Sequence, residues 1–346
     1  MTTALLIIGL FLIVMIHVPI AVALGVVALA GMLLSNGFSS VYNAALTMFD
    51  GATSFPLLAI PLFILAGALM NTTSISRRLI NLTSALIGFV RGGLAMVNVG
   101  VSMFFAEISG SAVADVAALG SVLIPAMKKR NYSAEFTAAI TSSSASIAII
   151  IPPSIAMILY GALSDTSIVQ LFVAGIIPGV LGGFAMMALC YWYAIRYDLP
   201  RESAFSLRKL WLAFKEAGWA LTLPVIILGG IFGGVVTATE GAGLAVVAAL
   251  IIGGFIYREI DWFHLRRAMI EGVMQTAVVM LLVATSAVLG LYLTEMQVPQ
   301  NFARWIIGFT SNKILVLALL NVMLFIVGMF LHGAAAIILI VPIVMP

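Results

Sequence analysis

Nine residues at positions 107–115, EISGSAVAD, place two carboxylates, two serines and a glycine inside an otherwise apolar sequence. A carboxylate near the centre of a membrane helix costs about 2.5–3.5 kcal/mol on insertion scales, so it normally has a partner or a path to water. Asp115 is therefore a candidate cation ligand, and Ser109, Gly110 and Ser111 form an oxygen-rich turn beside it. The alternative is structural: Asp115 caps the tip of a hairpin, and the small residues allow close helix packing.

A second polar group surrounds a proline pair in TSSSASIAIIIPPSIAMILYG, residues 141–161. Pro152 and Pro153 remove two backbone donors, so a helix must break near Ile150. The broken ends expose carbonyls, which suit a cation, and amides, which suit an anion. The serines around the break are candidate ligands or simple helix-packing residues: Ser142, Ser143, Ser144, Ser146 and Ser154.

Glu240 is a third candidate, in the stretch VVTATEGAG. Two interpretations are open. Glu240 is either a turn residue at the outer surface or a carboxylate that faces a cavity.

Long apolar helices must position these groups. Of the 346 residues, 63% are hydrophobic and 8% are charged, and about 20 apolar residues span a bilayer core. The sequence therefore predicts an all-α polytopic membrane protein. The predicted spans are 4–34, 55–75, 94–108, 116–127, 134–163, 170–195, 217–236, 241–257, 271–296 and 313–331, with a last apolar piece at 333–346.

The segments 94–108 and 116–127 are short for full crossings, and both flanks of the pair are basic. Two half-length helices that begin and end on one side of the membrane form a re-entrant hairpin. EISGSAVAD is then the tip of that hairpin. Non-helical backbone at membrane depth is tolerated only inside protein or beside a water-filled cavity.

The distribution of basic residues supports this hairpin independently. We place the N-terminus in the cytoplasm and treat 94–127 as a segment that does not cross. All 16 Lys and Arg residues then lie inside except Arg304 and Lys313, as the positive-inside rule expects. A full crossing by 94–127 would invert every later segment and remove this bias.

The chain also resembles itself at two places. Residues 103–127 and 328–346 both run from Met-Phe through small residues to an aliphatic-Pro pair. Opposite directions of entry would make them inverted repeats, with hairpins and broken helices that meet at the midplane. We therefore predict a first half, 1–215, with the hairpin 94–127 and the broken helix 134–163. The second half, 216–346, is expected to stop within a second hairpin.

Several other classes are not expected. The single cysteine, Cys190, excludes a disulfide framework and a cysteine-based metal cluster, and its apolar surroundings favour core packing. The HExxH and Walker A motifs are absent from the sequence, so neither zinc-dependent hydrolysis nor ATP hydrolysis is expected. The basic residues are explained by membrane topology and not by nucleic-acid binding. The protein is not predicted to be an enzyme, and no cofactor is expected.

Four stretches resemble the large membrane subunit of tripartite ATP-independent periplasmic (TRAP) transporters. They are SFPLLAIPLFILAGALMN, FFAEISGSAVADVAALGSVLIPAMKKR, SSSAS followed by IIPPSIAMILYG, and GLYLTEMQVPQ. The resemblance covers nearly the whole chain. It implies a sodium-driven importer of organic acids with an elevator mechanism, in the bacterial inner membrane. The implied substrates are C4-dicarboxylates, sialic acids or other sugar acids, and the implied partners are a small four-helix membrane subunit and a periplasmic substrate-binding protein.

The resemblance also assigns roles to residues. It implies that Ser109, Ser111 and Asp115 lie in the sodium and substrate region of the first hairpin. Ser154 falls on the matching broken helix, and Glu240 precedes an arm helix of the second half. Sodium also fits the hard oxygen ligands and the lone carboxylates. A dicarboxylate symporter without a binding protein is the alternative, followed by a channel or an intramembrane enzyme.

Overall fold

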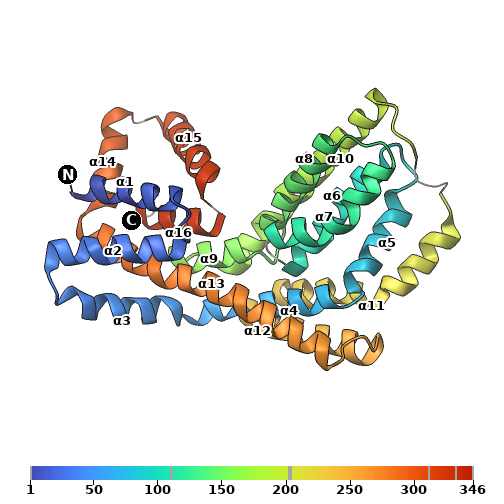
Figure 1. The fold of residues 1–346 in the computed structure, drawn as a ribbon, viewed down its shortest axis with the longest axis horizontal. Coiled ribbons are helices and arrows are strands. Elements are labelled where there is room, and N and C mark those ends of the chain that lie inside the picture. Colours follow the sequence, from blue (N-terminus) through green and yellow to red (C-terminus); the bar gives the residue numbers. More distant parts are fainter. Residues whose placement is uncertain (1, 110–111, 202–204, 311, 332, 345–346) are drawn as a thin grey trace. The chain divides into compact units, whose positions relative to one another are not determined.

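The computed structural model describes residues 2–109, 112–201, 205–310, 312–331 and 333–344, without the side chains of 2–5, 7, 105–109, 112–115, 117, 118, 303, 307 and 330. These residues form sixteen α-helices joined by short connections (Figure 1). The predicted all-α class is therefore confirmed.

The chain divides into two compact units by its internal contacts. The first unit comprises residues 1–57, 159–166 and 275–346. Its helices are α1 (Thr2–Met15), α2 (Ile20–Asn36), α3 (Ser40–Ala52), the end of α9 (Ile155–Ser164), the C-terminal part of α13 (Trp262–Glu295), α14 (Val298–Phe309), α15 (Lys313–Phe330) and α16 (Gly333–Val344). The division into repeat halves at residue 215 is a different kind of boundary and stays a prediction.

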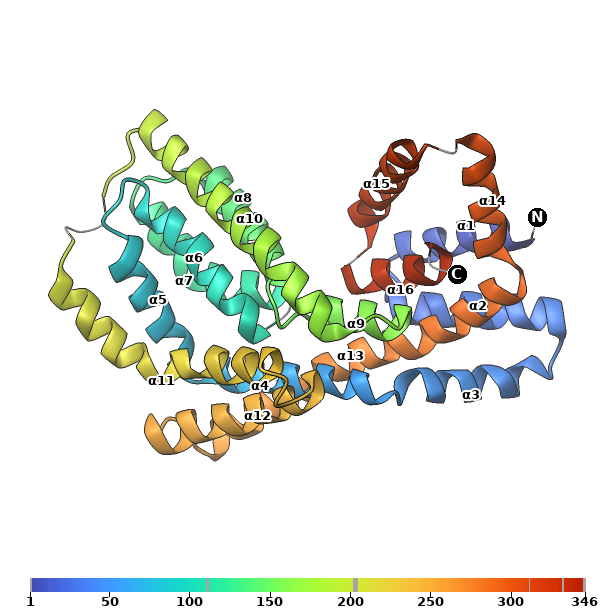
Figure 2. The same ribbon diagram turned by 180° about the vertical axis from the view of Figure 1, so that it is seen from behind.

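The second unit comprises residues 58–158 and 167–274. Within it, α12 packs along α4, and α11 packs along both α5 and α12 (Figure 2). Its α-helices are α4 (Ala59–Thr72), α5 (Ile75–Ile87), α6 (Gly93–Ser109), α7 (Ala112–Lys129), α8 (Ala134–Ala145), the start of α9 (Ile155–Ser164), α10 (Ile168–Arg196), α11 (Leu207–Phe232), α12 (Ala238–Leu250) and the start of α13. Three short helices are η1 (Phe55–Leu58), η2 (Ser146–Ile149) and the π-helical η3 (Ile251–Ile256).

Five helical segments in the described part of the chain are long and apolar enough to cross a membrane: Phe55–Thr72, Ile168–Arg196, Leu207–Phe232, Ala238–Ile256 and Trp262–Glu295. They coincide with five predicted spans. However, α11 begins at Leu207 and α13 at Trp262, whereas the predicted spans begin at 217 and 271. Hydropathy detects only the apolar part of a helix. The polar turns that precede this part are helical as well, so the helix begins earlier than hydropathy indicates.

The predicted single span 4–34 is wrong. The chain forms two helices there, α1 and α2, which pack against each other and are separated by residues 16–19. Pro19 lacks a backbone donor and takes extended backbone angles, φ −52° and ψ 132°, immediately before α2. Hydropathy did not mark this boundary because residues on both sides of the proline are apolar.

A polar cluster links α5, α11 and the segment after η3. We call Ser74, Arg78, Glu216, Tyr257 and Glu259 the Arg78 cluster. The Glu259 carboxylate accepts hydrogen bonds from the Ser74 amide at 2.7 Å and the Ser74 hydroxyl at 2.6 Å. The Arg78 guanidinium lies 3.5 Å from Glu259 and 4.0 Å above the Tyr257 ring, and the Tyr257 hydroxyl donates to the Glu216 carbonyl at 3.0 Å.

The Arg78 cluster perturbs its own titratable groups. Partial burial raises the pKa of Glu259, but the Ser74 hydrogen bonds and the Arg78 charge outweigh it and hold the pKa below the ordinary 4.5. Burial raises the pKa of Tyr257 above its ordinary 10.0. Glu259 is therefore an ionised cap for the N-terminus of α5, supplied by another segment.

Candidate functional site

The predicted hairpin corresponds to α6 and α7, which pack against each other in the second unit. Ser109 is the last residue of α6, and Asp115 lies in the first turn of α7. Gly110 and Ser111 lie outside the described residues, as do the side chains of Ser109 and Asp115. The predicted cation ligands at the hairpin tip therefore stay a prediction.

The helix that follows is interrupted at the proline pair. It begins with α8, whose N-cap Ser133 accepts a hydrogen bond from the Phe136 amide at 3.2 Å. After α8 the chain continues as η2, and the next α-helix, α9, begins at Ile155. Pro152 and Pro153 are both buried in this gap and are joined by a cis peptide bond. The interruption falls where two missing backbone donors require it.

Ser154 joins the two sides of the break. Its hydroxyl donates to the carbonyl oxygen of Ile149 at 2.6 Å and accepts from the amide of Met157 at 3.4 Å. The first bond satisfies a carbonyl at the end of η2, and the second caps the first turn of α9. The side chain is completely buried. Its observed contacts are structural, and its role toward a ligand stays a prediction.

Two polar pairs fasten α6 to α8. The Asn98 side-chain amide donates to the Thr141 hydroxyl at 2.7 Å, and the Ser102 hydroxyl donates to the Ser144 hydroxyl at 3.0 Å. All four side chains are buried. Asn98 and Ser102 are four residues apart and therefore share one face of α6. Sequence analysis missed both of them, although their spacing inside an apolar helix was a usable signal.

The serines before the break divide between two faces of the chain. Ser144 is buried against α6, whereas Ser142, Ser143 and Ser146 are exposed on this chain. Ser142 donates to the Ala138 carbonyl at 2.8 Å, and Ser146 donates to the Ser142 carbonyl at 3.3 Å. Among the predicted ligands of this run, the structure thus brings Ser144 into the packed interface with the hairpin.

Three glycines of α10 allow the broken helix and α6 to approach closely. A Cβ atom at Gly175 would collide with the Ile150 carbonyl oxygen, one at Gly179 with Ile151, and one at Gly183 with Met103. These glycines are spaced by four residues and form one stripe along α10. Figures 1 and 2 both show α10 running along α6. The backbone at the break is therefore packed inside protein, as non-helical backbone at membrane depth requires.

Glu240 has a local structural role. Its carboxylate accepts from the Thr237 amide at 2.8 Å and the Thr237 hydroxyl at 2.9 Å, and its own amide donates to the Thr237 hydroxyl at 3.3 Å. These bonds form a capping box at the start of α12. The residue is exposed on this chain. Its observed contacts are those of a helix cap, and its role toward a ligand stays a prediction.

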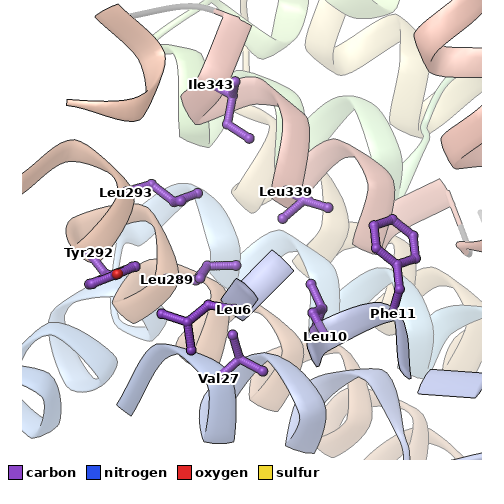
Figure 3. Close-up of a pocket in the computed structure, with 9 residues that line it drawn as sticks. All are labelled: Leu6, Leu10, Phe11, Val27, Leu289, Tyr292, Leu293, Leu339 and Ile343. Atoms are coloured by element: carbon purple, nitrogen blue, oxygen red, sulfur yellow. The ribbon is translucent and has the colours of Figure 1, made fainter. Parts of the chain in front are cut away.

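The first unit contains an apolar pocket that is distinct from these groups (Figure 3). Its lining comes from α1, α2, α13 and α16, and Tyr292 is the one lining residue with a polar side-chain atom. The lining residues are Leu6, Leu10, Phe11, Val27, Leu289, Tyr292, Leu293, Leu339 and Ile343. Such a lining offers a cation or an organic anion no set of ligands.

Within the described residues, no group of three or more His, Cys, Asp or Glu side chains is arranged to hold a metal ion. The oxygen-bearing groups instead gather where the α6–α7 hairpin meets the broken helix. The fold is that of a polytopic α-helical membrane protein, and its second unit contains buried polar pairs between α6 and α8.

The comparison with known proteins gives the family. Residues 7–346 match the family described as "Tripartite ATP-independent periplasmic transporter, DctM component". The chain is 42% identical over 339 residues to the isethionate TRAP transporter permease protein DctMQ of Oleidesulfovibrio alaskensis, covering 98% of this chain and 53% of that protein. It is 38% identical over 307 residues to the C4-dicarboxylate TRAP transporter large permease protein DctM of Pseudomonas aeruginosa, covering 89% and 72%.

A third relative is the sialic acid TRAP transporter large permease protein SiaM of Vibrio cholerae, 36% identical over 95% of this chain and 77% of that protein. The chain thus spans about half of the DctMQ protein and about three quarters of the other two. The chain belongs to the DctM family of TRAP transporter components. This is a family of membrane transporters and not of enzymes, as the sequence predicts.

Proposed function

We propose that the chain is the large membrane subunit of a sodium-coupled secondary importer for an organic acid in the bacterial inner membrane. The observation that carries the proposal is the packing of the α6–α7 hairpin on a helix broken at Pro152–Pro153. Such irregular backbone inside an apolar chain is a feature of transporter binding sites, where half-helix ends meet substrate and ion. Membership of the DctM family supports the same function.

Within this proposal, Ser109, Ser111 and Asp115 bind sodium. Sodium neutralises Asp115 and so offsets the cost of burying its charge. The neutralised site and the nearby amide ends of half-helices then hold the substrate carboxylate. Coupling follows because each ion makes the other less costly to bury.

The class of the transported acid is inferred from the relatives, and the need for partners is inferred from the charge of the predicted outer side. Their names include isethionate, C4-dicarboxylate and sialic acid, which are organic anions. The predicted outer side carries only Arg304 and Lys313 as basic residues, so it would attract anions weakly. We therefore propose that a periplasmic binding protein delivers the substrate and that a small membrane subunit completes the complex.

The transport movement that we propose is an elevator motion of inverted repeats. Support comes from the similarity of residues 103–127 to 328–346. Repeats that enter from opposite sides give a site that can open alternately to each side.

Uptake into proteoliposomes tests the coupling. The complete complex, with binding protein and small subunit, should accumulate an organic acid when a sodium gradient is imposed. Equal accumulation on a proton gradient alone would contradict sodium coupling. Uptake that needs no binding protein would favour the dicarboxylate symporter, and flux without any gradient coupling would favour a channel.

Asp115→Asn tests the ion site. The variant keeps the size of the side chain and removes its charge, so we expect sodium dependence and transport to weaken together while the protein still folds. Asp165→Asn, at an exposed position between helices, is the matched control and should transport normally. Retention of the wild-type sodium affinity by Asp115→Asn would remove Asp115 from the site.

A further inference from the structure

The first ten residues of α11 extend beyond its apolar run. The helix spans Leu207–Phe232, 26 residues, and is about 39 Å long at about 1.5 Å per residue, whereas a bilayer core is about 30 Å thick. Its last charged residue is Glu216, and residues 217–232 are uncharged. The apolar part fills most of the core, so residues 207–216 lie at the level of the lipid headgroups.

The start of α11 is a well-formed helix with a defined inner side. The Ser206 hydroxyl caps it by accepting from the Lys209 amide at 3.5 Å. Farther along α11, the residues that pack on other helices are Ala217, Ala220, Leu223, Ile227 and Ile231. At 100° per residue, Trp211, Phe214 and Lys215 lie on the opposite side of the helix.

This outer side is both aromatic and basic. Trp211 is 66% exposed and Phe214 is 49% exposed, and their rings stack with centroids 6.1 Å apart. Arg208 and Lys215 are exposed beside them. We call Leu207, Arg208, Trp211, Phe214 and Lys215 the α11 entry surface. Aromatic rings suit the membrane interface, and long basic side chains reach its phosphates.

We propose that the α11 entry surface binds the headgroups of anionic phospholipids. Residues 207–216 carry three basic side chains against one acidic side chain, Glu216, so the charge is complementary to a negative leaflet. The rings lie in the interface, and Arg208 and Lys215 contact the lipid phosphates. This proposal does not depend on the transported substrate or on the coupling ion.

A second helix repeats the pattern. The helix α13 also begins before its apolar run, at Trp262, and Asp261 caps it by accepting from the His264 amide at 2.8 Å. Trp262 and Phe263 are 78% and 67% exposed, and Arg266 and Arg267 are exposed one turn later. Two long helices that start on the same predicted side with exposed rings and basic residues favour one planar charged partner, a membrane surface.

Fluorescence quenching tests the proposal on the complex with its small membrane subunit. The protein has five tryptophans. Brominated phosphatidylglycerol should quench the fluorescence of Trp211 at lower concentration than brominated phosphatidylcholine does, and Trp211→Phe should remove that component. Each basic residue near an anionic surface contributes roughly fivefold in affinity, so Arg208→Gln with Lys215→Gln should weaken phosphatidylglycerol binding about 30-fold.

Two further variants serve as controls. Arg304→Gln with Lys313→Gln removes the same charge elsewhere and should leave the affinity unchanged, and Arg208→Lys with Lys215→Arg keeps the charge and should retain binding. Equal quenching by the two lipids would overturn the proposal, as would an equal loss in the Arg304/Lys313 variant. Quenching of Trp211 only when the small subunit is absent would also overturn it, because that subunit would then occupy the surface.

Discussion

Ser154 illustrates how one hydroxyl can hold a broken helix together. It satisfies the Ile149 carbonyl and the Met157 amide on opposite sides of the break. We expect Ser154→Ala to lower the free energy of unfolding by about 1–3 kcal/mol, because a buried carbonyl then loses its donor. Thermal unfolding in detergent measures the effect. Ser146→Ala, at an exposed position in the same segment, should change stability by less than about 0.5 kcal/mol.

Asn98 contributes to the same interface in a different way. Its amide donates to Thr141, while its side-chain oxygen is buried and has no hydrogen-bond partner among the described residues. A buried amide that is only partly satisfied is costly, so its presence in α6 favours a role beyond packing. It adds a polar group to the interface between the hairpin and α8.

The Arg78 cluster connects α5, α11 and the segment after η3. Arg78→Gln removes the ion pair with Glu259 and the contact with the Tyr257 ring. We expect a loss of about 1–2 kcal/mol in stability, since the charged groups are partly exposed and solvent screens them. The neighbouring Arg77→Gln, at an exposed position of α5, is the control. Equal melting temperatures for the two variants would contradict a stabilising role of the cluster.

The same cluster predicts a pH dependence. The pKa of Glu259 is below its ordinary 4.5 in the folded protein. A carboxyl with a depressed folded pKa contributes stability above its unfolded pKa and loses it as the pH falls through the folded value. Wild-type stability should therefore fall as the pH drops below about 4.5, and Glu259→Gln should lack this component. Melting temperatures measured from pH 7 to pH 3 for both proteins test this expectation.

The α10 glycine stripe gives a test of helix packing. A Cβ atom at Gly179 would lie 2.5 Å from Ile151 Cγ1, whereas one at Gly182 would meet nothing within 4 Å. We expect Gly179→Ala to destabilise the protein by about 1–3 kcal/mol through overpacking. Gly182→Ala should be neutral or stabilise it by up to about 1 kcal/mol, because alanine favours a helix. Similar melting temperatures would show that the break can move away from α10.

The two helices at the start of the chain change the predicted topology of the whole protein. Positive-inside counting places residues 37–54 outside. Because α1 and α2 pack against each other around the turn 16–19, the start of α1 then lies on the same outer side as residues 37–54. This reverses the placement of the N-terminus that a single span 4–34 requires.

Cysteine labelling of intact cells tests this topology. Cys190 is the only cysteine, so Cys190→Ala provides a clean background. A membrane-impermeant maleimide should label both Thr2→Cys, at the start of α1, and Ser39→Cys. Arg304→Cys is the outside control and Lys128→Cys the inside control. Labelling of Ser39→Cys without labelling of Thr2→Cys would restore the single-span topology.

The sequence by itself determined the class, the family and the site of the helix break. Long apolar runs can be stable only in a bilayer, and Pro152–Pro153 interrupts a helix whatever surrounds it. These properties are local, so they can be predicted without knowledge of packing. The lengths of the apolar segments are also a local property, and they predicted the pair of helices between residues 94 and 127.

Only the tertiary structure decided which polar groups meet. Ser142, Ser143 and Ser144 are three identical residues in a row. Because each residue of a helix is rotated by 100° from the one before it, only Ser144 points toward α6. Asn98 donates a hydrogen bond to Thr141, which lies 43 residues later in the sequence. No local sequence pattern predicts such a long-range contact. The observed contacts of Glu240 form a capping box with Thr237, and its role toward a ligand stays a prediction. Side-chain partners depend on how helices rotate and pack, and hydropathy leaves that packing undetermined.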